Sequence, residues 1–384
     1  MAKMAKMGVL DKSCYDASLE RIEWLFDSYD QVAVSFSGGK DSTVCLNLCL
    51  EVARHKKRLP LRVFTYDEEA IPPETVEYME RVRQNDEIDF TWFCVPIQHR
   101  NACSAKEPYW YPWAPEDEHK WVRPLPKDAV TNYKGFKRQG IADQIGHLFP
   151  PNKGTVANVM GIRTDESMSR YRNIASRRGD KAFFSQLPQA KWVINAYPIY
   201  DWRTADVWLA PSVFDWDYNH AYDVMRRAGI TLHQQRCAPP YGEQPIRGLD
   251  KFKVCWPELW DKMVMRVHGA ATAARYANTN LYGVGIKDSD LPAGMTWEKL
   301  TLTTLRKLQP NSRREASDAI NTCIALHKNR SKLPIPDSDA DPTSGFCWKT
   351  LYIAAKVGGN KFNRQMQKMC QVALHERAKR GITE

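Results

Sequence analysis

The residues with the clearest chemical potential lie together in one short segment, Ser35-Phe-Ser-Gly-Gly-Lys-Asp-Ser42. Two adjacent glycines let the chain turn sharply and bring backbone N–H groups close to a ligand. Ser37 and Ser42 add hydroxyl donors, and Lys40 adds a cation. A helix that begins behind the glycines points the positive end of its dipole at the same place. The segment is therefore expected to bind an anion such as phosphate.

The elements around the segment have the order that such a site requires. Residues 31–36 read as a buried strand, and an apolar helix is expected from Thr43 to about Arg54. The segment lacks the spacing of a Walker A loop, and it lacks the third glycine of a dinucleotide fingerprint. The alternative is an ordinary Gly-Gly turn that caps a helix. The serine, lysine and aspartate residues in register favour the phosphate site.

The rest of the chain predicts an α/β fold. Strands alternate with helices, which indicates a doubly wound parallel sheet with helices on both faces. A stretch rich in proline and aromatic residues interrupts the alternation over about 96–135, and from about residue 230 the pattern becomes helical. We expect an α/β domain over 1–225 and a basic, mainly helical C-terminal region over 226–384. The further strands are expected over 61–66, 90–95, 155–160 and 193–199.

Four segments, in order along residues 31–208, carry a resemblance to one family. The segment that ends at Ser42 resembles the PP-loop of ATP pyrophosphatases, and three later segments resemble those of phosphoadenosine phosphosulfate (PAPS) reductases. The resemblance implies an adenine nucleotide alpha hydrolase-like fold that binds ATP, PAPS or adenosine phosphosulfate (APS), together with Mg²⁺. The three later segments are Tyr66-Asp67 with Pro73-Glu-Thr75, Gly161-Ile-Arg-Thr-Asp-Glu-Ser-Met-Ser-Arg170 and Pro198-Ile-Tyr-Asp-Trp-Arg-Thr-Ala-Asp-Val-Trp208.

The resemblance also implies which residues bind the nucleotide and which react. Backbone and side chains of the loop are expected to hold the phosphates, and residues that follow other strands are expected to complete the site. No metal-ligating residues are assigned. The expected nucleotide-binding residues are Ser35, Ser37, Gly38, Gly39, Lys40, Asp41, Ser42, Asp67, Gly161, Arg163 and Arg170. The expected catalytic residues are Lys40, Asp41, Arg163 and Cys237.

Asp41, Asp67 and Arg163 also have a structural interpretation. Asp41 either caps the helix or helps to place Mg²⁺, and Asp67 either contacts the ribose or caps the next helix. Arg163 either neutralises charge that builds on a phosphate in the transition state or pairs with Asp165 or Glu166. The sequence leaves both interpretations of each residue open.

Cysteine chemistry separates the candidate reactions. A PAPS reductase needs a catalytic cysteine in a C-terminal E-C-G-x-H-type motif, and the tail of this chain reads His375-Glu-Arg-Ala-Lys-Arg380. This departure argues against sulfonucleotide reduction. Cys237 is the best candidate thiol, because the adjacent Arg236 is expected to favour its thiolate form; a buried structural cysteine is the alternative. Arg170 is expected to contact a phosphate or the substrate, with a surface salt bridge as the alternative.

Composition bears on the partners and on the cellular compartment. The chain has 384 residues, a formal net charge of +10 and a sequence pI near 9.0. A basic surface of this kind either favours nucleic acid or phosphate-rich substrates or is simply solvated. The ten cysteines form no C-x-x-C pair, and the sequence has neither an apolar run of membrane-spanning length nor a secretory signal. We therefore expect a cytoplasmic protein with no membrane partner.

A narrower resemblance covers the aromatic stretch and parts of the C-terminal region. Tyr109 to Trp121, Arg236 to Gly248 and Gly294-Met-Thr-Trp297 are similar to bacterial, prophage and phage proteins related to the immunoglobulin-binding regulator A group. Such proteins are typically encoded beside a ParB/sulfiredoxin-like protein, which the resemblance implies as a partner. The sequence leaves three roles open for the aromatic stretch. It can form a lid over the nucleotide, pack as a small separate core, or stack on nucleic-acid bases.

Three functions are compatible with these features. The first is an ATP-binding transferase that adenylates an acceptor with release of pyrophosphate, in DNA or RNA modification or in sulfur transfer. The second is a reductase or sulfotransferase that acts on PAPS or APS. The third is a non-catalytic, nucleotide-sensing DNA-binding regulator that acts with the ParB/sulfiredoxin-like partner.

Overall fold

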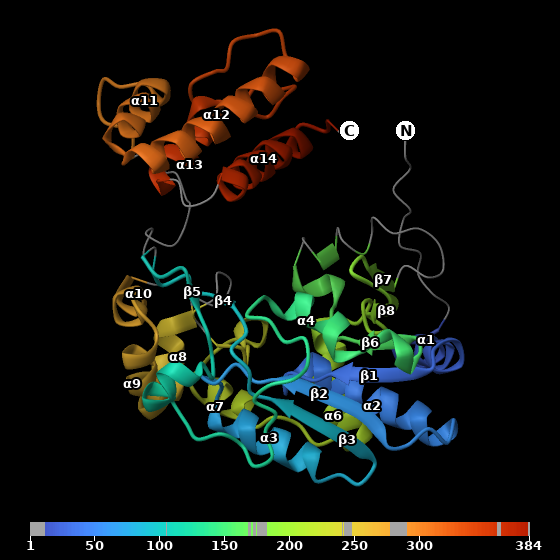
Figure 1. Ribbon diagram of the computed structural model, residues 1–384. Coiled ribbons are helices and arrows are strands. Elements are labelled where there is room, and N and C mark those ends of the chain that lie inside the picture. Colours follow the sequence, from blue (N-terminus) through green and yellow to red (C-terminus); the bar gives the residue numbers. More distant parts are fainter. Residues whose placement is uncertain are drawn as a thin grey trace. The chain divides into compact units, whose positions relative to one another are not determined.

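The computed structural model shows two compact units, residues 1–277 and 278–384 (Figure 1). None of the helices that the structure describes is long and apolar enough to cross a membrane. The structure describes residues 12–104, 106–167, 170–171, 174, 183–239, 241, 248–276, 290–358 and 362–382.

The two units divide between residues 277 and 278, whereas the sequence suggested a boundary between residues 225 and 226. Three helices beyond residue 248 belong to the first unit. One of them supplies Arg266, which forms a buried ion pair with Glu69 at 3.0 Å. This contact joins residues almost 200 positions apart, so no local pattern in the sequence indicates it. The three helices are α8 (Leu249–Cys255), α9 (Pro257–Arg266) and α10 (Ala270–Tyr276).

The first unit is built on a six-stranded sheet with the order β3-β2-β1-β6-β8-β7. Five strands run parallel to one another, as the sequence predicted. The edge strand β7, which the sequence did not indicate, pairs antiparallel with β8. In the sheet, β2 lies on one side of β1, and β6, which comes later in the chain, lies on the other side. A topological switch point, where ligands bind in such sheets, therefore lies at the end of β1. The strands are β1 (Gln31–Ser35), β2 (Leu61–Tyr66), β3 (Ile88–Phe93), β6 (Val156–Val159), β7 (Phe184–Leu187) and β8 (Ala190–Ala196).

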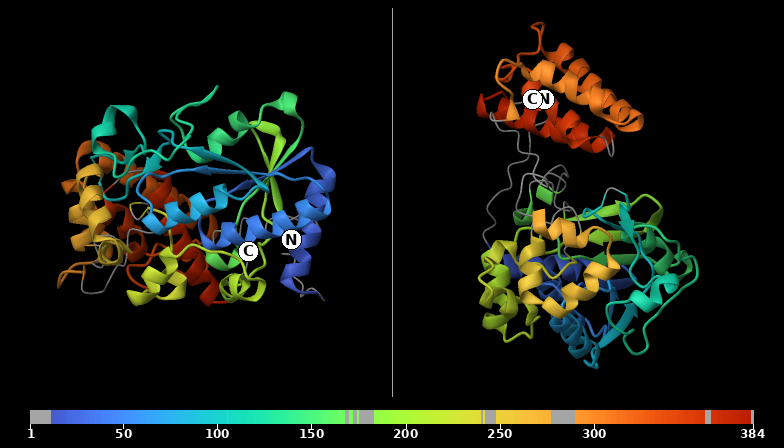
Figure 2. Two further views of the ribbon diagram at one scale, coloured as in Figure 1. Left: turned by 90° about the horizontal axis from the view of Figure 1, so that it is seen from below. Right: turned by 90° about the vertical axis from the view of Figure 1, so that its left-hand side faces the viewer.

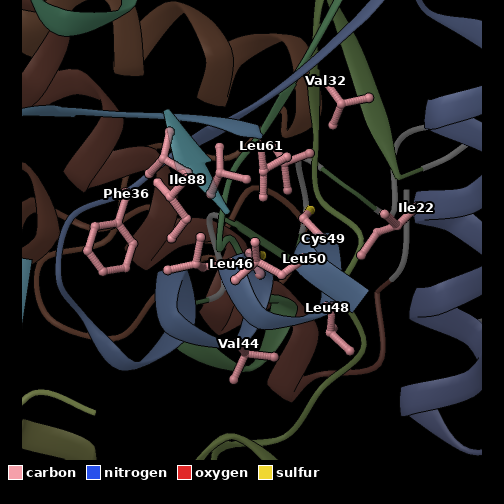
Figure 3. Packing of buried hydrophobic residues seen from close by; sticks show 14 of the residues in the cluster. Ile22, Val32, Phe36, Val44, Leu46, Leu48, Cys49, Leu50, Leu61 and Ile88 are labelled. Carbon is pink, nitrogen blue, oxygen red and sulfur yellow. The ribbon is translucent and has the colours of Figure 1, made fainter. Parts of the chain in front are cut away.

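Helices cover both faces of this sheet (Figures 1 and 2). Side chains alternate along β1, so Val32 and Val34 join the larger core cluster while Ala33 joins the cluster on the opposite face. Figure 3 shows Leu46 and Leu50 of α2 on the side of Leu61 and Ile88 of the strands, whereas Val44 and Leu48 point away from them. The larger cluster contains residues of α1 (Cys14–Ser28), α2 (Lys40–His55), α3 (Pro73–Arg83) and α6 (Thr204–Phe214), and the smaller contains residues of α4 (Ile141–Leu148).

The aromatic stretch over 96–135 contains little regular structure. Its two short strands, β4 (His99–Arg100) and β5 (Tyr109–Trp110), form an antiparallel pair, and a 3₁₀ turn follows. Trp110 and Trp113 are buried at 6% and 1% exposure, and the Trp113 indole donates to the backbone carbonyl of Asp67 at 3.1 Å. Trp113 therefore lies at the end of β2, Trp110 packs against Tyr241, and neither is exposed for stacking on nucleic-acid bases.

The second unit is helical in its described part, as the sequence predicted for the C-terminal region (orange to red in Figure 2). Its core includes Ile320, Cys323, Leu351 and Met369, all of which are buried. An apolar stripe along the last helix supplies Met369 and Ala373 to this core. The helices are α11 (Trp297–Lys307), α12 (Pro310–Arg330), α13 (Trp348–Val357) and α14 (Phe362–Lys379).

Candidate functional site

The candidate site begins at the turn between β1 and α2. Gly38 has a backbone φ of +68°, in the left-handed region that favours glycine. A Cβ atom at Gly38 would also lie 2.9 Å from Thr75 Cγ2 of α3. Gly39 is the N-cap residue of α2, and no side chain caps this helix. The turn therefore depends on glycine, and it places the positive end of the α2 dipole at the loop.

Two residues in and before α7 (Ala221–Arg227) hold this turn. Asn219 Nδ2 donates to the Gly38 carbonyl at 2.8 Å, and the Lys40 N–H donates to the Tyr222 hydroxyl at 2.8 Å. Sequence reasoning missed both Asn219 and Tyr222. They lie 181 and 182 residues from their partners, and no motif marks them.

Ser37 and Ser42, the two serines of the loop, form hydrogen bonds within the turn. Ser37 Oγ and Ser42 Oγ lie 3.1 Å apart, and Ser42 Oγ donates to the Gly39 carbonyl at 2.9 Å. Since each hydroxyl has further hydrogen-bonding capacity, both serines can also contact a bound anion.

Gly161, which follows β6, lies directly against the first turn of α2. A Cβ atom at this position would lie 2.6 Å from the Asp41 carbonyl carbon and 2.8 Å from the Ser42 nitrogen. Backbone atoms cannot move aside as a side chain can, so only glycine fits without displacing the helix. The structure thus brings the Gly161 segment and the loop together.

Asp41 lies between two cations. Lys40 Nζ is 3.0 Å from Asp41 Oδ2, and Arg163 Nε forms an ion pair with Asp41 Oδ1. Arg163 is 1% exposed and also donates to the Trp202 carbonyl at 3.3 Å. Arg163 Nη1 also forms an ion pair with Asp165 at 3.6 Å, so the pairing alternative is confirmed. Arg163 therefore positions Asp41, and the capping role considered for Asp41 is not seen.

Asp67 follows β2 and is only 2% exposed. Its carboxylate accepts from the Trp92 indole at 2.7 Å and from the Glu69 N–H at 2.7 Å, and it pairs with Arg123. The Trp113 indole also lies within hydrogen-bonding distance, at 3.3 Å. Asp67 thus anchors the aromatic stretch, and no side chain caps α3, so the capping alternative was wrong.

A cavity of about 370 Å³ opens beside the turn, at the switch point of the sheet. Most of the nucleotide-binding and catalytic residues expected from the sequence line this cavity. Two expected residues do not line it: Gly38 lies against α3, and Arg163 lies behind Asp41. The expected residues that do line the cavity are Ser35, Ser37, Gly39, Lys40, Asp41, Ser42, Asp67, Gly161, Arg170 and Cys237.

Among the described residues, the cations that line this cavity are Lys40, Arg170 and Arg236. Arg170 pairs with Glu166, and burial, together with repulsion from Arg236, lowers the pKa of Arg170. A polyanion in the cavity would relieve that repulsion. The arrangement therefore suits a phosphate chain, held by backbone N–H groups on one side and by guanidinium groups on another.

Cys237 lines the same cavity but is 6% exposed. Asn219 Nδ2 lies 3.4 Å from its sulfur. Burial raises the pKa of Cys237 to about 11, although a hydrogen bond with Tyr222 acts in the opposite direction. The expectation of a lowered thiol pKa was therefore wrong, because burial outweighs the hydrogen bonds and the charge of Lys40 that act in the opposite direction.

Alkylation with iodoacetamide should reveal the protonated state of Cys237. At pH 7.5 we expect Cys237 to react far more slowly than Cys370 of α14, whose pKa is lowered by a hydrogen bond from Cys323. The rate at Cys237 should rise about tenfold per pH unit, since only the thiolate reacts. Peptide mass spectrometry over a pH series measures both rates. Equal rates at pH 7.5 would contradict the prediction.

Glu68 is a cavity residue that sequence reasoning missed, although it follows directly after Asp67. Its side chain is 25% exposed, and Oε1 lies 3.2 Å from Nδ1 of His99. Burial, together with the neighbouring Asp67 charge, raises the pKa of Glu68 to about 7. Burial lowers the pKa of His99 to about 4, and its Nε2 has no hydrogen-bond partner among the described residues.

This raised pKa predicts a pH-dependent stability. Because the folded pKa of Glu68 lies above the ordinary value of 4.5, folding favours the protonated carboxyl. The associated stability is present below about pH 4.5 and is lost as the pH rises to about 7. Relative to Glu68→Gln, the wild-type protein should therefore lose about 2 kcal/mol of unfolding free energy between pH 5 and pH 8.

Chemical denaturation at several pH values measures this difference. Glu87→Gln is the control, because its pairing with Arg54 lowers the pKa of Glu87. That variant should differ from wild type by a constant amount between pH 5 and pH 8. The same flat profile for Glu68→Gln would show that Glu68 titrates normally.

Two family models match the chain. Residues 31–225 match the phosphoadenosine phosphosulfate reductase domain, and residues 229–333 match a domain of unknown function, DUF3440. The protein YbdN of Escherichia coli (strain K12), described as uncharacterized, is 32% identical over 332 residues. The alignment covers 83% of this chain and 80% of YbdN.

Solved structures show weaker likeness. Candida glabrata FMN adenylyltransferase matches with a TM-score of 0.35 at 12% sequence identity. The match covers 57% of this chain and 63% of the adenylyltransferase, which is less than two thirds of the length of the adenylyltransferase. A phosphoadenylyl-sulfate (PAPS) reductase from Candida auris, in its phosphate complex, matches with a TM-score of 0.32 at 12% identity. That match covers 57% of this chain and 94% of the reductase.

Proposed function

The chain belongs to the phosphoadenosine phosphosulfate reductase domain family, and from this premise we propose that it binds ATP in the loop cavity and adenylates an acceptor. The observation that carries the proposal is the convergence of the glycine turn, Lys40, Arg170 and Arg236 on one cavity at the switch point. The proposed products are an adenylated acceptor and pyrophosphate.

The state of the thiols supports adenylation over reduction. Cys237 lines the cavity, but burial keeps its thiol protonated at neutral pH, and a protonated thiol is a poor nucleophile. The sequence also lacks the C-terminal E-C-G-x-H-type motif of sulfonucleotide reductases. The cavity suits PAPS or APS as well as ATP, but the reductive step has no suitable residue there among those described.

The loop residues account for the proposed reaction. The acceptor attacks the α-phosphorus, and the bond to the oxygen that bridges the α- and β-phosphorus atoms breaks. The backbone N–H groups of the loop and the α2 dipole stabilise the departing pyrophosphate. Lys40 and Arg170 neutralise the charge that builds on the phosphoryl oxygens.

Mg²⁺ fits one carboxylate of this site. Asp41 lines the cavity and is paired with Lys40, and Mg²⁺ bound to phosphates commonly takes one or two protein carboxylates. Asp41 would hold the ion, and Lys40 would then be available to the phosphates. When bound, Mg²⁺ neutralises phosphate charge and orients the leaving group.

Measurement of AMP and pyrophosphate tests the proposal. The full chain with ATP and Mg²⁺ should release both when an acceptor is present, and DNA and RNA are the first acceptors to add. Gly39→Asp should remove the activity, because it places a negative charge where the phosphates bind. Arg81→Ala is the control, since Arg81 forms an exposed pair with Asp217 outside the cavity. Equal activity in Gly39→Asp and wild type would refute the proposal.

Two finer proposals rest on the sequence resemblance. We propose that the chain belongs to the subgroup related to the immunoglobulin-binding regulator A proteins and acts beside a ParB/sulfiredoxin-like protein. The basic charge supports a nucleic-acid acceptor or partner. A regulator without catalysis would bind DNA with strong salt dependence and would release no AMP in the same assay.

A further inference from the structure

A second and larger cavity lies next to the loop cavity. Its volume is about 850 Å³, within the range of roughly 300–1,000 Å³ that ligand sites occupy. It is lined by residues of α6, of α7 and of the 3₁₀ turn η4 (Leu232–Gln234). Lys40 and Tyr222 line both cavities. A ligand here would therefore lie beside the nucleotide.

Aromatic rings form much of the wall of this second cavity. Trp208, Trp216, Tyr218 and Tyr222 all line it. The rings of Trp208 and Tyr222 meet edge to face, with centroids 4.9 Å apart and an interplanar angle of 85°. The Tyr218 hydroxyl donates to Asp223 at 3.1 Å. Because neighbours fix these rings, the wall is ready to pack against the face or edge of a planar aromatic ligand.

Charge indicates where an anionic substituent of the ligand would lie. Lys40 Nζ is 5.9 Å from the centre of the Trp208 ring and 6.0 Å from that of the Tyr222 ring. Asp223 also lines the cavity, but its carboxylate already accepts from Tyr218 and contacts His220 at 2.9 Å. Asp215 and Arg226 line the wall as a further anion and cation. An anionic group of the ligand would therefore lie near Lys40, at the end of the second cavity that adjoins the loop cavity.

We propose that this second cavity binds the acceptor of the adenylyl group, a planar aromatic compound that carries a carboxylate or phosphate oxygen. The acceptor role rests on the proposed function, whereas the binding of such a compound does not. An anionic oxygen of the ligand attacks the α-phosphorus and forms the new bond. The bond from that phosphorus to the bridging oxygen breaks, and its electron pair leaves with pyrophosphate. No proton transfer is needed.

A binding experiment without ATP tests the site. The fluorescent aromatic anion 8-anilinonaphthalene-1-sulfonate should bind the full chain at a saturable site, with one equivalent displaced by quinoline-2-carboxylate. Quinoline lacks the anion and cyclohexanecarboxylate lacks the aromatic ring, so each should displace the dye at least tenfold less well. Equal displacement by all three compounds, or no saturable binding, would overturn the proposal.

Variants locate the bound compound. Trp208→Ala should weaken quinoline-2-carboxylate at least tenfold, and Trp208→Phe, which preserves the ring and the packing, should weaken it less. Val254→Ala is the control, because Val254 is an apolar residue of α8 that is 71% exposed and does not line the cavity. An effect of Val254→Ala equal to that of Trp208→Ala would overturn the proposal.

The same measurement separates this site from the proposed function. Arg170→Ala should weaken ATP binding at least tenfold and leave quinoline-2-carboxylate binding within a factor of two, since Arg170 lines the loop cavity but not the second cavity. Loss of AMP release with intact ring binding counts against the adenylation reaction alone. Loss of ring binding with intact AMP release counts against the second cavity alone.

Discussion

Gly161→Ala is expected to weaken ATP binding about a hundredfold, which corresponds to about 2.7 kcal/mol. The added Cβ atom would lie 2.6 Å from the Asp41 carbonyl carbon, so the first turn of α2 must shift. A shift of that turn moves Lys40 and the loop N–H groups away from the phosphates. Isothermal titration calorimetry with ATP measures the loss.

Gly248→Ala is the matched control for this prediction. Apart from its chain neighbours, no atom of the described residues lies within 4 Å of a Cβ built on Gly248, and its φ of −99° is open to alanine. We expect an unchanged dissociation constant for this variant. If Gly161→Ala also bound ATP normally, then the contact between the β6 loop and α2 would have no part in forming the site.

Arg266→Met is expected to lower the free energy of unfolding by about 3–5 kcal/mol. Glu69 is 0% exposed, and Arg266 contacts both of its carboxylate oxygens, at 3.0 and 3.1 Å. Removal of the guanidinium leaves a buried carboxylate without its counter-ion. Denaturation followed by tryptophan fluorescence measures the loss mainly in the first unit, since Trp297 and Trp348 are the tryptophans beyond residue 277.

Two further variants separate this effect from a general loss of packing. Glu69→Gln combined with Arg266→Met should recover more than half of the lost stability, because no uncompensated charge remains. Arg81→Met removes an exposed pair with Asp217 and should change the unfolding free energy by less than about 1 kcal/mol. A double variant as unstable as Arg266→Met alone would argue against an electrostatic cause.

Short-range patterns account for what could be predicted of the fold. Strand β1, the glycine turn and the start of α2 follow one another within about 25 residues, so a single pattern covers them. The parallel sheet follows from the alternation of strands and helices. The antiparallel strand β7 has only four residues and a mixed burial pattern, so its periodicity gives no clear signal.

The unpredicted parts of the site depend on distant contacts or on burial. Asn219 and Tyr222 reach the loop from more than 180 residues away, and neither lies in a recognisable motif. Glu68 acquires its raised pKa from burial, which the sequence does not show. Burial likewise raises the pKa of Cys237, where the sequence suggested a lowered one. Residue types thus indicate the chemistry of a site, whereas its electrostatics depend on the folded surroundings.

Tyr222 belongs to the walls of both cavities, and its hydroxyl receives the Lys40 N–H. Two ligands that both contact the Tyr222 ring, one in each cavity, have linked binding affinities. Thermodynamic reciprocity requires that the factor by which the first ligand changes the affinity for the second equals the factor in the reverse direction. The stability of the ternary complex is therefore independent of the order of uptake, and a change at Tyr222 alters both affinities together.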